Sequence, residues 1–428
     1  MASAVLFGVF ALLLLGGMPI VFAMAVSAVV LLLTFGRDLP LTLIPHQMVA
    51  GTDSFLLLAI PLFFLAGELM NAGGITIRLV RFSACLVGHI RGGLAYVVIV
   101  TNMIMAGFSG SAVADASATG SVLIPSMKRD GYHAGFAAAV TAAASTIGPV
   151  IPPSIPMIVF AAIGEVSVGR LFLAGVAPGL LMGLYLMAAV FWISRRRGYP
   201  TQPRASWREL RRATAEAIWA LLAPVIIVGG ILAGFVTPTE AAALAVLYSL
   251  IVGIFIHREL RWRDLPRILR QSAVGTGVVM IIVAASGIMG WEVANLRVSD
   301  QVVSGILAVT REPWAILLFV NALFLVLGCL LDPIAAMIIF VPVLLPLVKQ
   351  VGIDLVHFGL VVVLNLMIGL LTPPVGYLLF ISSALADVPV EAVVREARPF
   401  IVALVVVLLL CTYWAPMVLW VPNLLLGP

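Results

Sequence analysis

The segment GPVIPPSIP, residues 148–156, places four prolines among nine residues inside an otherwise apolar stretch. Proline lacks a backbone N–H and breaks helices, which is costly where no water can replace the lost hydrogen bond. A second segment, GLLTPPVG at residues 369–376, carries the same double proline. Both segments predict helices that are interrupted at membrane depth.

The composition sets the class of protein. The chain has 428 residues, of which 63% are hydrophobic and 10% charged, and a soluble domain does not hide that much apolar surface. Runs such as 220–235 and 399–414 have the length and polarity of spanning helices. The first thirty residues lack a basic n-region and a small-residue cleavage site, which favours a membrane helix over a removed signal. We therefore expect an all-α, multi-pass integral membrane protein.

The net charge of +5 reflects topology and not nucleic-acid binding. Lysine and arginine cluster in short loops, and loops that carry them stay cytoplasmic. The topology below assigns 19 of the 24 basic residues to that side. The exceptions are Arg37, Arg170, Arg297, Arg311 and Lys349.

The chain repeats itself at a constant offset of 221 residues. The offset pairs Pro152–Pro153 with Pro373–Pro374, and it aligns further matches: Gly107 with Gly328, Pro125 with Pro346, Lys128 with Lys349, Gly131 with Gly352, Gly148 with Gly369 and Pro178 with Pro399. Self-similarity of this kind predicts two structural repeats. We place the first at 1–195 and the second at 216–428, joined by a basic cytoplasmic linker at 196–215.

Each repeat shows the same sequence of predicted elements. Two helices (3–17 and 18–35; 216–236 and 239–257) precede a third (53–72; 271–291) and a charged segment suited to the interface (74–90; 293–310). Next comes a pair of short apolar runs split by a small-residue or acidic tip (about 92–127; about 313–348). A helix broken by the double proline follows (about 132–165; about 355–386), and a last span closes each half.

The paired short runs predict re-entrant hairpins. An arm of about 15 residues reaches roughly 22 Å, which is short of a hydrocarbon core of about 30 Å. Five crossings per half is an odd number, so the second repeat is inverted relative to the first. The hairpins then enter from opposite faces, with their tips near the midplane, as in secondary transporters.

Broken helices leave free carbonyls on one side of a break and free N–H groups on the other. The carbonyl ends suit Na⁺, and the N–H ends suit a carboxylate. The tips add oxygens from Ser109, Ser111, Asp115 and Asp332, with no basic residue nearby, which favours a bound cation. The alternative is that Ser109 and Ser111 only cap the helix at 114–127 and that Asp332 only caps the helix at 334–348.

Other acids have simpler interpretations. The spacing from Thr237 to Glu240 is that of a capping box. Glu68 lies near a helix end, so an interfacial position is expected, with a proton site as the alternative. The sequence contains no nucleophile elbow, phosphate loop or zinc-binding helix, so we expect no enzymatic activity.

Three stretches carry a specific resemblance: GFSGSAVADASATGSVLIPSMKRDGYHAGFAAAVTAAASTIGPVIPPSIP from 107, FVTPTEAAALAVLY from 235 and GIDLVHFGLVVVLNLMIGLLTPPVGYLLF from 352. They resemble the large membrane subunit of tripartite ATP-independent periplasmic (TRAP) transporters. The resemblance implies a subunit in the bacterial inner membrane that imports an organic acid, such as a C4-dicarboxylate or a sialic acid. It also implies an elevator-type fold, Na⁺ as the coupling ion and no cofactor.

The resemblance also implies site residues and partners. One Na⁺ site would use Ser109, Ser111, Asp115, Gly148, Val150 and Pro153. The other would use Gly328, Cys329, Asp332, Thr372 and Val375. Substrate contacts would come from Ser111, Ser154, Asp332 and Thr372. The partners would be a small four-helix membrane subunit, expected as a separate polypeptide, and a periplasmic substrate-binding protein.

Two alternatives remain open on the sequence. One is a stand-alone exchanger or symporter with a similar fold, driven by Na⁺ or by protons through Glu68 or Asp115. The other is a channel or an intramembrane enzyme, although no catalytic pair is found.

Overall fold

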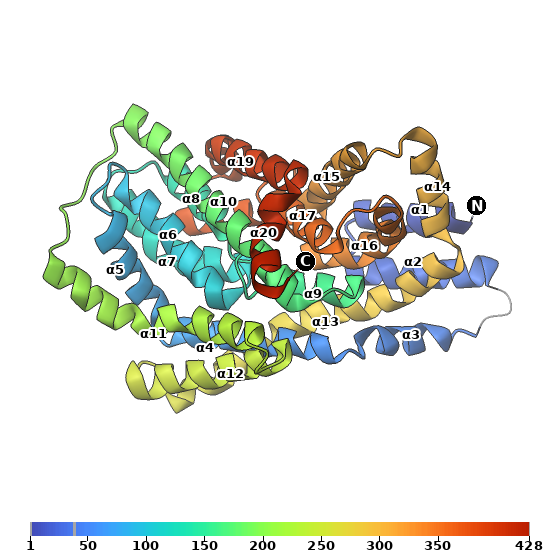
Figure 1. Cartoon of the computed structure of the whole chain (residues 1–428), viewed down its shortest axis with the longest axis horizontal. Coiled ribbons are helices and arrows are strands. Elements are labelled where there is room, and N and C mark those ends of the chain that lie inside the picture. The colour runs from blue at the N-terminus through green and yellow to red at the C-terminus, as the bar shows by residue number, and fades with distance from the viewer. Residues whose placement is uncertain (1, 37–39, 428) are drawn as a thin grey trace.

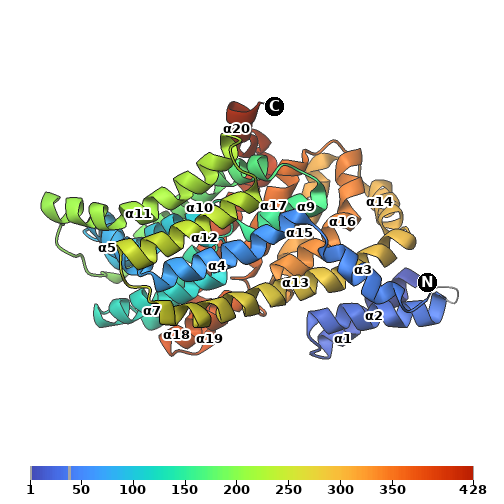
Figure 2. The ribbon, with the colours of Figure 1, turned by 90° about the horizontal axis from the view of Figure 1, so that it is seen from below.

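The computed structural model describes residues 2–36 and 40–427, and every regular element within these ranges is helical. The all-α class is therefore confirmed. Figures 1 and 2 show an elongated bundle in which segments from both halves of the chain interleave.

The first half contains eleven elements in the order that the sequence predicts, with one addition, α3. They are α1 (Ala2–Leu15), α2 (Ile20–Phe35), α3 (Leu43–Thr52), η1 (Phe55–Leu58), α4 (Ala59–Ala72), α5 (Ile75–Val87), α6 (Gly93–Ser109), α7 (Ala112–Arg129), α8 (Ala134–Ser145), α9 (Ile155–Gly164) and α10 (Val168–Arg197).

The second half repeats this order from the basic linker onward. Its elements are α11 (Trp207–Leu232), α12 (Pro238–Ile251), the π-helical turn η2 (Val252–Ile256), η3 (Trp262–Asp264), α13 (Leu265–Asn295), α14 (Val298–Val309), α15 (Pro313–Leu330), α16 (Pro333–Gln350), α17 (Leu355–Gly369), α18 (Tyr377–Ala386), α19 (Val390–Tyr413) and α20 (Ala415–Leu426).

Seven helical segments among the described residues are long and apolar enough to span a membrane. The last predicted span is not straight, because α19 and α20 are bent by 66°, and together they make an eighth candidate. The hairpin arms α15 and α16 have 18 residues each, longer than the 15 expected. These two arms are among the seven candidate spans by length and apolarity, although an arm of about 27 Å does not reach the full thickness of a hydrocarbon core of about 30 Å.

Two capping boxes fix where helices begin. In the predicted one, Glu240 N–H donates to Thr237 Oγ1 at 3.3 Å, and Thr237 N–H donates to Glu240 Oε2 at 2.7 Å. A second box, which the sequence analysis missed, joins Ser206 and Glu209. It starts α11 at Trp207, so the predicted start at 216 is wrong and this helix begins inside the predicted linker.

The third helix differs between the halves. The first half has α3, a break and then α4, whereas α13 is one helix of 31 residues. At the break Ser54 is extended, and Thr52 turns its hydroxyl back to the Val49 carbonyl at 2.8 Å. Threonine, aspartate and serine compete with helical hydrogen bonds in this way. The helix predicted over 53–72 therefore corresponds to η1 and α4, and the prediction omits α3 before the break.

The equivalent helices run in opposite directions where they pack. Gly51 of α3 contacts Gly287 of α13, and Phe64 of α4 contacts Gly275 of α13. Residue numbers therefore rise along one helix as they fall along the other, as Figure 2 also shows. An antiparallel relation between equivalent elements is the mark of an inverted repeat.

The core of the molecule is built on α8 and α17. Every residue from 136 to 150 and from 356 to 371 is buried. α8 is rich in alanine, which lets neighbouring helices approach closely, as small residues do in membrane proteins. Both central helices end at the predicted breaks. The first break, 146–154, is almost entirely buried, whereas Pro373, Pro374 and Val375 of the second break are exposed.

A glycine contact joins the second hairpin to the second break. A Cβ on Gly369 would collide with the backbone of Gly328. We expect Gly369→Ala to destabilise the protein by about 1–3 kcal/mol, because the added methyl group meets the Gly328 backbone, which cannot move aside as a flexible side chain can. Gly290→Ala on α13 is the matched control, since nothing lies within 4 Å of the added methyl group. Thermal unfolding in detergent checks this, and equal melting temperatures would contradict it.

Candidate functional site

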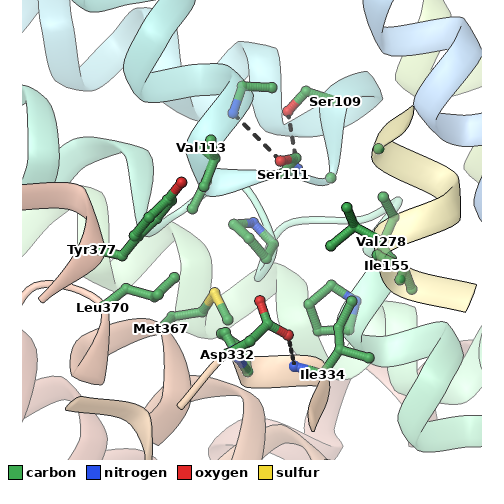
Figure 3. A pocket seen from close by; sticks show the side chains of 18 of the residues that line it. Ser109, Ser111, Val113, Ile155, Val278, Asp332, Ile334, Met367, Leu370 and Tyr377 are labelled. Carbon is green, nitrogen blue, oxygen red and sulfur yellow. Dashed lines mark hydrogen bonds between the residues drawn. The ribbon is translucent and has the colours of Figure 1, made fainter. Parts of the chain in front are cut away.

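The two hairpin tips and both helix breaks line one cavity of about 830 Å³. Tip 1 is Gly110–Ser111, between α6 and α7, and tip 2 is Leu331–Asp332, between α15 and α16. Figure 3 shows Ser109 and Ser111 on one side of the cavity and Asp332 on the other. The two hairpin tips therefore face one shared cavity.

Tip 1 presents two hydroxyl groups. Gly110 takes the left-handed conformation that ends α6, with φ of 59°. Ser111 is extended, and its Oγ accepts a hydrogen bond from the Ala114 N–H at 3.4 Å, which caps α7. Ser109 Oγ accepts from the Ser111 N–H at 3.5 Å. A hydroxyl oxygen keeps a further lone pair for a ligand, so capping and ion binding are compatible.

Asp115 lies one turn into α7 and is completely buried. Its carboxylate reaches the first break, where a Cβ on Gly148 would collide with Oδ2. Neither carboxylate oxygen has a hydrogen-bond partner among the described residues. A buried, unpaired carboxylate is strongly unfavourable, so this position calls for a cation or a proton.

The first break covers residues 146–154, and its backbone packs against tip 1. The Pro153 carbonyl faces Gly110, and the Val150 carbonyl faces Gly175 of α10. Ser154 caps α9 by accepting from the Met157 N–H at 3.2 Å, and its hydroxyl donates to the Pro149 carbonyl. Ser154 is fully buried and does not line the cavity, so the structure does not place this predicted substrate ligand at the cavity surface.

Tip 2 presents a carboxylate where tip 1 presents a hydroxyl. Asp332 Oδ1 accepts from the N–H groups of Ile334 and Ala335, at 2.9 and 3.3 Å, and so caps α16. Oδ2 makes no hydrogen bond to the described residues. Gly328, Cys329 and Asp332 all line the cavity, as predicted for one site.

The second break covers residues 370–376. Val375 lines the cavity and is 42% exposed. Thr372 lies outside the lining residues, and its Oγ1 donates to the Ile368 carbonyl at 2.7 Å. Its hydroxyl lone pairs stay available to a ligand, but a direct substrate contact from Thr372 would need the break to move.

A further wall of the cavity comes from α4 and α13. It includes Phe64, Glu68 and Asn71 of α4 and Gly275 and Val278 of α13. Glu68 therefore lies in the wall of the cavity, which its expected interfacial position did not indicate. The pattern near a helix end could not reveal that α4 packs beside the hairpins.

The lining of the cavity carries acids without bases. Glu68 and Asp332 are its charged residues, and no lysine, arginine or histidine is among the lining residues that the structure describes. An organic anion in this cavity would therefore depend on bound cations, hydroxyl groups and helix N-termini for its attraction.

We expect Ser111→Ala to lower Na⁺-dependent uptake about tenfold or more, because it removes a cap and a cavity oxygen together. The cap alone is worth about 1 kcal/mol. Ser121→Ala is the matched control, since its exposed hydroxyl on the same helix bonds only to the Ala118 carbonyl. Uptake by the two variants, normalised to membrane content, checks this. Equal uptake would show that the tip hydroxyl is dispensable.

Inverted repeats, paired hairpin tips and two broken helices around one cavity define a secondary-transporter fold. The crystal structure of the Alcanivorax borkumensis YdaH transporter shares this fold, with a TM-score of 0.60 over 87% of each chain at 11% identity.

The family described as "Tripartite ATP-independent periplasmic transporter, DctM component" matches residues 7–417. The sialic acid TRAP transporter large permease SiaM of Vibrio cholerae is 41% identical over 97% of each chain. The C4-dicarboxylate TRAP transporter large permease DctM of Pseudomonas aeruginosa is 39% identical over 87% of each chain. This chain belongs to the TRAP transporter large permease family.

Proposed function

We propose that this chain is the large membrane subunit of a Na⁺-coupled importer of an organic acid. The observation that carries the proposal is the cavity itself, where two tips and two breaks offer oxygens around acids that lack basic partners. Sodium at the two sites would neutralise Asp115 and Asp332 and attract the anion. One site would use Ser109, Ser111, Asp115, Gly148, Val150 and Pro153, and the other Gly328, Cys329, Asp332, Thr372 and Val375.

The substrate class follows from chemistry and from the relatives. Capping sites at the starts of α7 and α16 face the cavity, and helix N-termini favour carboxylates. Relatives are named for sialic acid and for C4-dicarboxylates. We therefore place the substrate among small organic acids that carry at least one carboxylate.

The proposed mechanism is an elevator. In this proposal the hairpins and the broken helices move as one body, since α7 packs on α8 and α18, and α16 packs on α9 and α17. α4 and α13 supply a further wall of the cavity. A site between two bodies can change its exposure when one slides along the other. The partners that we propose are a small four-helix membrane subunit and a periplasmic substrate-binding protein, which the tripartite nature of the family supports.

Uptake into proteoliposomes tests the function. The large subunit is reconstituted with its candidate small subunit, and radiolabelled organic acids are added with the candidate binding protein. We expect uptake only with an inward Na⁺ gradient and with all three components. Uptake by the large subunit alone would instead identify a stand-alone symporter, and uptake without Na⁺ would overturn the proposed coupling.

A further inference from the structure

Glu68 is a charged group in the cavity that the two proposed sodium sites do not use. It lies on α4, in a wall of the cavity beside tip 1, where its neighbour Gly67 lies next to the backbone of Ser109. No ion pair or hydrogen bond to its carboxylate is found among the described residues, and the group is half-buried. An ionised Glu68 would repel an organic anion brought into the same cavity.

Few positive charges near Glu68 could offset the negative charge of its carboxylate. The positive charge of Arg267 on α13 favours the ionised form of Glu68, but the two side chains form no ion pair within 4 Å. The other charged groups of α13 are Arg270 and Glu292, and Asp332 adds a negative charge across the cavity.

The remaining elements that pack on α4 add few charges. α6, α9, η1 and η2 carry none, and α12 carries only Glu240 in its first turn. α5 carries Arg78, which is paired with Glu259 at 2.7 Å, and Arg81, which lies 3.7 Å from Glu216.

We propose that Glu68 binds a proton when the organic anion occupies the cavity, so that transport carries H⁺ in addition to Na⁺. The proposal rests on the proposed function as an importer of organic acids. The proton comes from water on the loading side, adds to a carboxylate oxygen of Glu68, and returns to water on the side where the anion is released. The charge on this wall is then absent whenever the anion is bound.

A proton fits this position better than a third sodium ion. Na⁺ needs several oxygen ligands, as hard cations do, and the residues within one turn of Glu68 on α4 offer few. Asn71 Oδ1 already accepts from Thr76 Oγ1 at 2.9 Å, which leaves mainly its N–H₂ donor. Phe64 and Gly67 add no side-chain oxygen. A protonated carboxyl needs only one acceptor and keeps a second oxygen for a donor.

Glu68→Gln tests the proposal, because glutamine resembles the protonated acid in shape and charge. Uptake is measured in reconstituted proteoliposomes between pH 6 and pH 8 at a constant Na⁺ gradient. For the wild type we expect uptake to fall as the external pH rises, by up to roughly tenfold per pH unit, the limit for one linked proton. For Glu68→Gln we expect the ratio of uptake at pH 6 to that at pH 8 to fall to about one.

The matched control is Glu391→Gln, an exposed acid in the first turn of α19, which should keep the wild-type ratio. A Glu68→Gln ratio equal to that of the wild type would overturn the proposal. A flat wild-type profile would overturn it too, and so would a Glu68→Gln protein that is inserted and stabilised by Na⁺ but inactive at every pH. The Na⁺ requirement of the wild type at fixed pH reports separately on the proposed function.

Discussion

Replacing Asp115 with asparagine should abolish the Na⁺ dependence of transport and leave the protein at least as stable in sodium-free buffer. The carboxylate is completely buried without a hydrogen-bond partner among the described residues, so its charge is unfavourable until a cation arrives. Outer-shell changes at metal sites already cost about 10- to 100-fold in affinity. Loss of a charged ligand should therefore cost roughly 100-fold or more.

Thermal unfolding across a Na⁺ titration measures this directly. A ligand that binds only the folded state raises the melting temperature, so Na⁺ should stabilise the wild type and have a much smaller effect on Asp115→Asn. Asp300→Asn, exposed on α14, should respond to Na⁺ as the wild type does. An undiminished sodium response in Asp115→Asn would mean that this carboxylate is not a ligand.

The second large effect is expected for Asp332→Asn. This substitution removes the negative charge of Asp332 but keeps its role as a helix cap. Asparagine is as good an N-cap as aspartate, so the hydrogen bonds from Ile334 and Ala335 are kept and α16 should stay intact. The negative charge at tip 2 is lost, and Na⁺-dependent uptake should fall by roughly 100-fold at unchanged membrane content.

Asp354→Asn is the matched control for this substitution. Asp354 caps α17 in the same way, accepting from the His357 N–H at 2.9 Å, and it does not line the cavity. This variant should transport normally. If Asp332→Asn transported equally well, Asp332 would be only a helix cap, and the second sodium site would be misassigned.

Much of this fold can be predicted from the sequence, because helix ends and breaks are determined by residues close to them in the chain. Proline and glycine punctuate helices in the same order in both halves, and one offset aligns them. The caps at Ser111 and Asp332 are local as well, since each side chain bonds to an N–H two or three residues on. Such features need no knowledge of the tertiary structure.

The remaining features depend on packing between distant segments. The approach of Asp115 to Gly148 and the place of Glu68 in the cavity wall follow from how α7 and α4 lie in the bundle. Ser154 looks like a ligand in sequence, but its hydroxyl bonds to the backbone of its own break. The different third helices, α3 with α4 against α13, also depart from the symmetry that the repeat predicts.

The relative orientation of the two hairpins is the central claim, and cysteine labelling measures it. Single cysteines replace the exposed, repeat-equivalent residues Arg129 and Gln350 at the hairpin bases, after Cys85, Cys329 and Cys411 have been changed to alanine. A membrane-impermeant maleimide should label position 350 in intact spheroplasts and position 129 only in inverted vesicles. Labelling of both positions from the same side would contradict the inverted repeat and the sodium sites that depend on it.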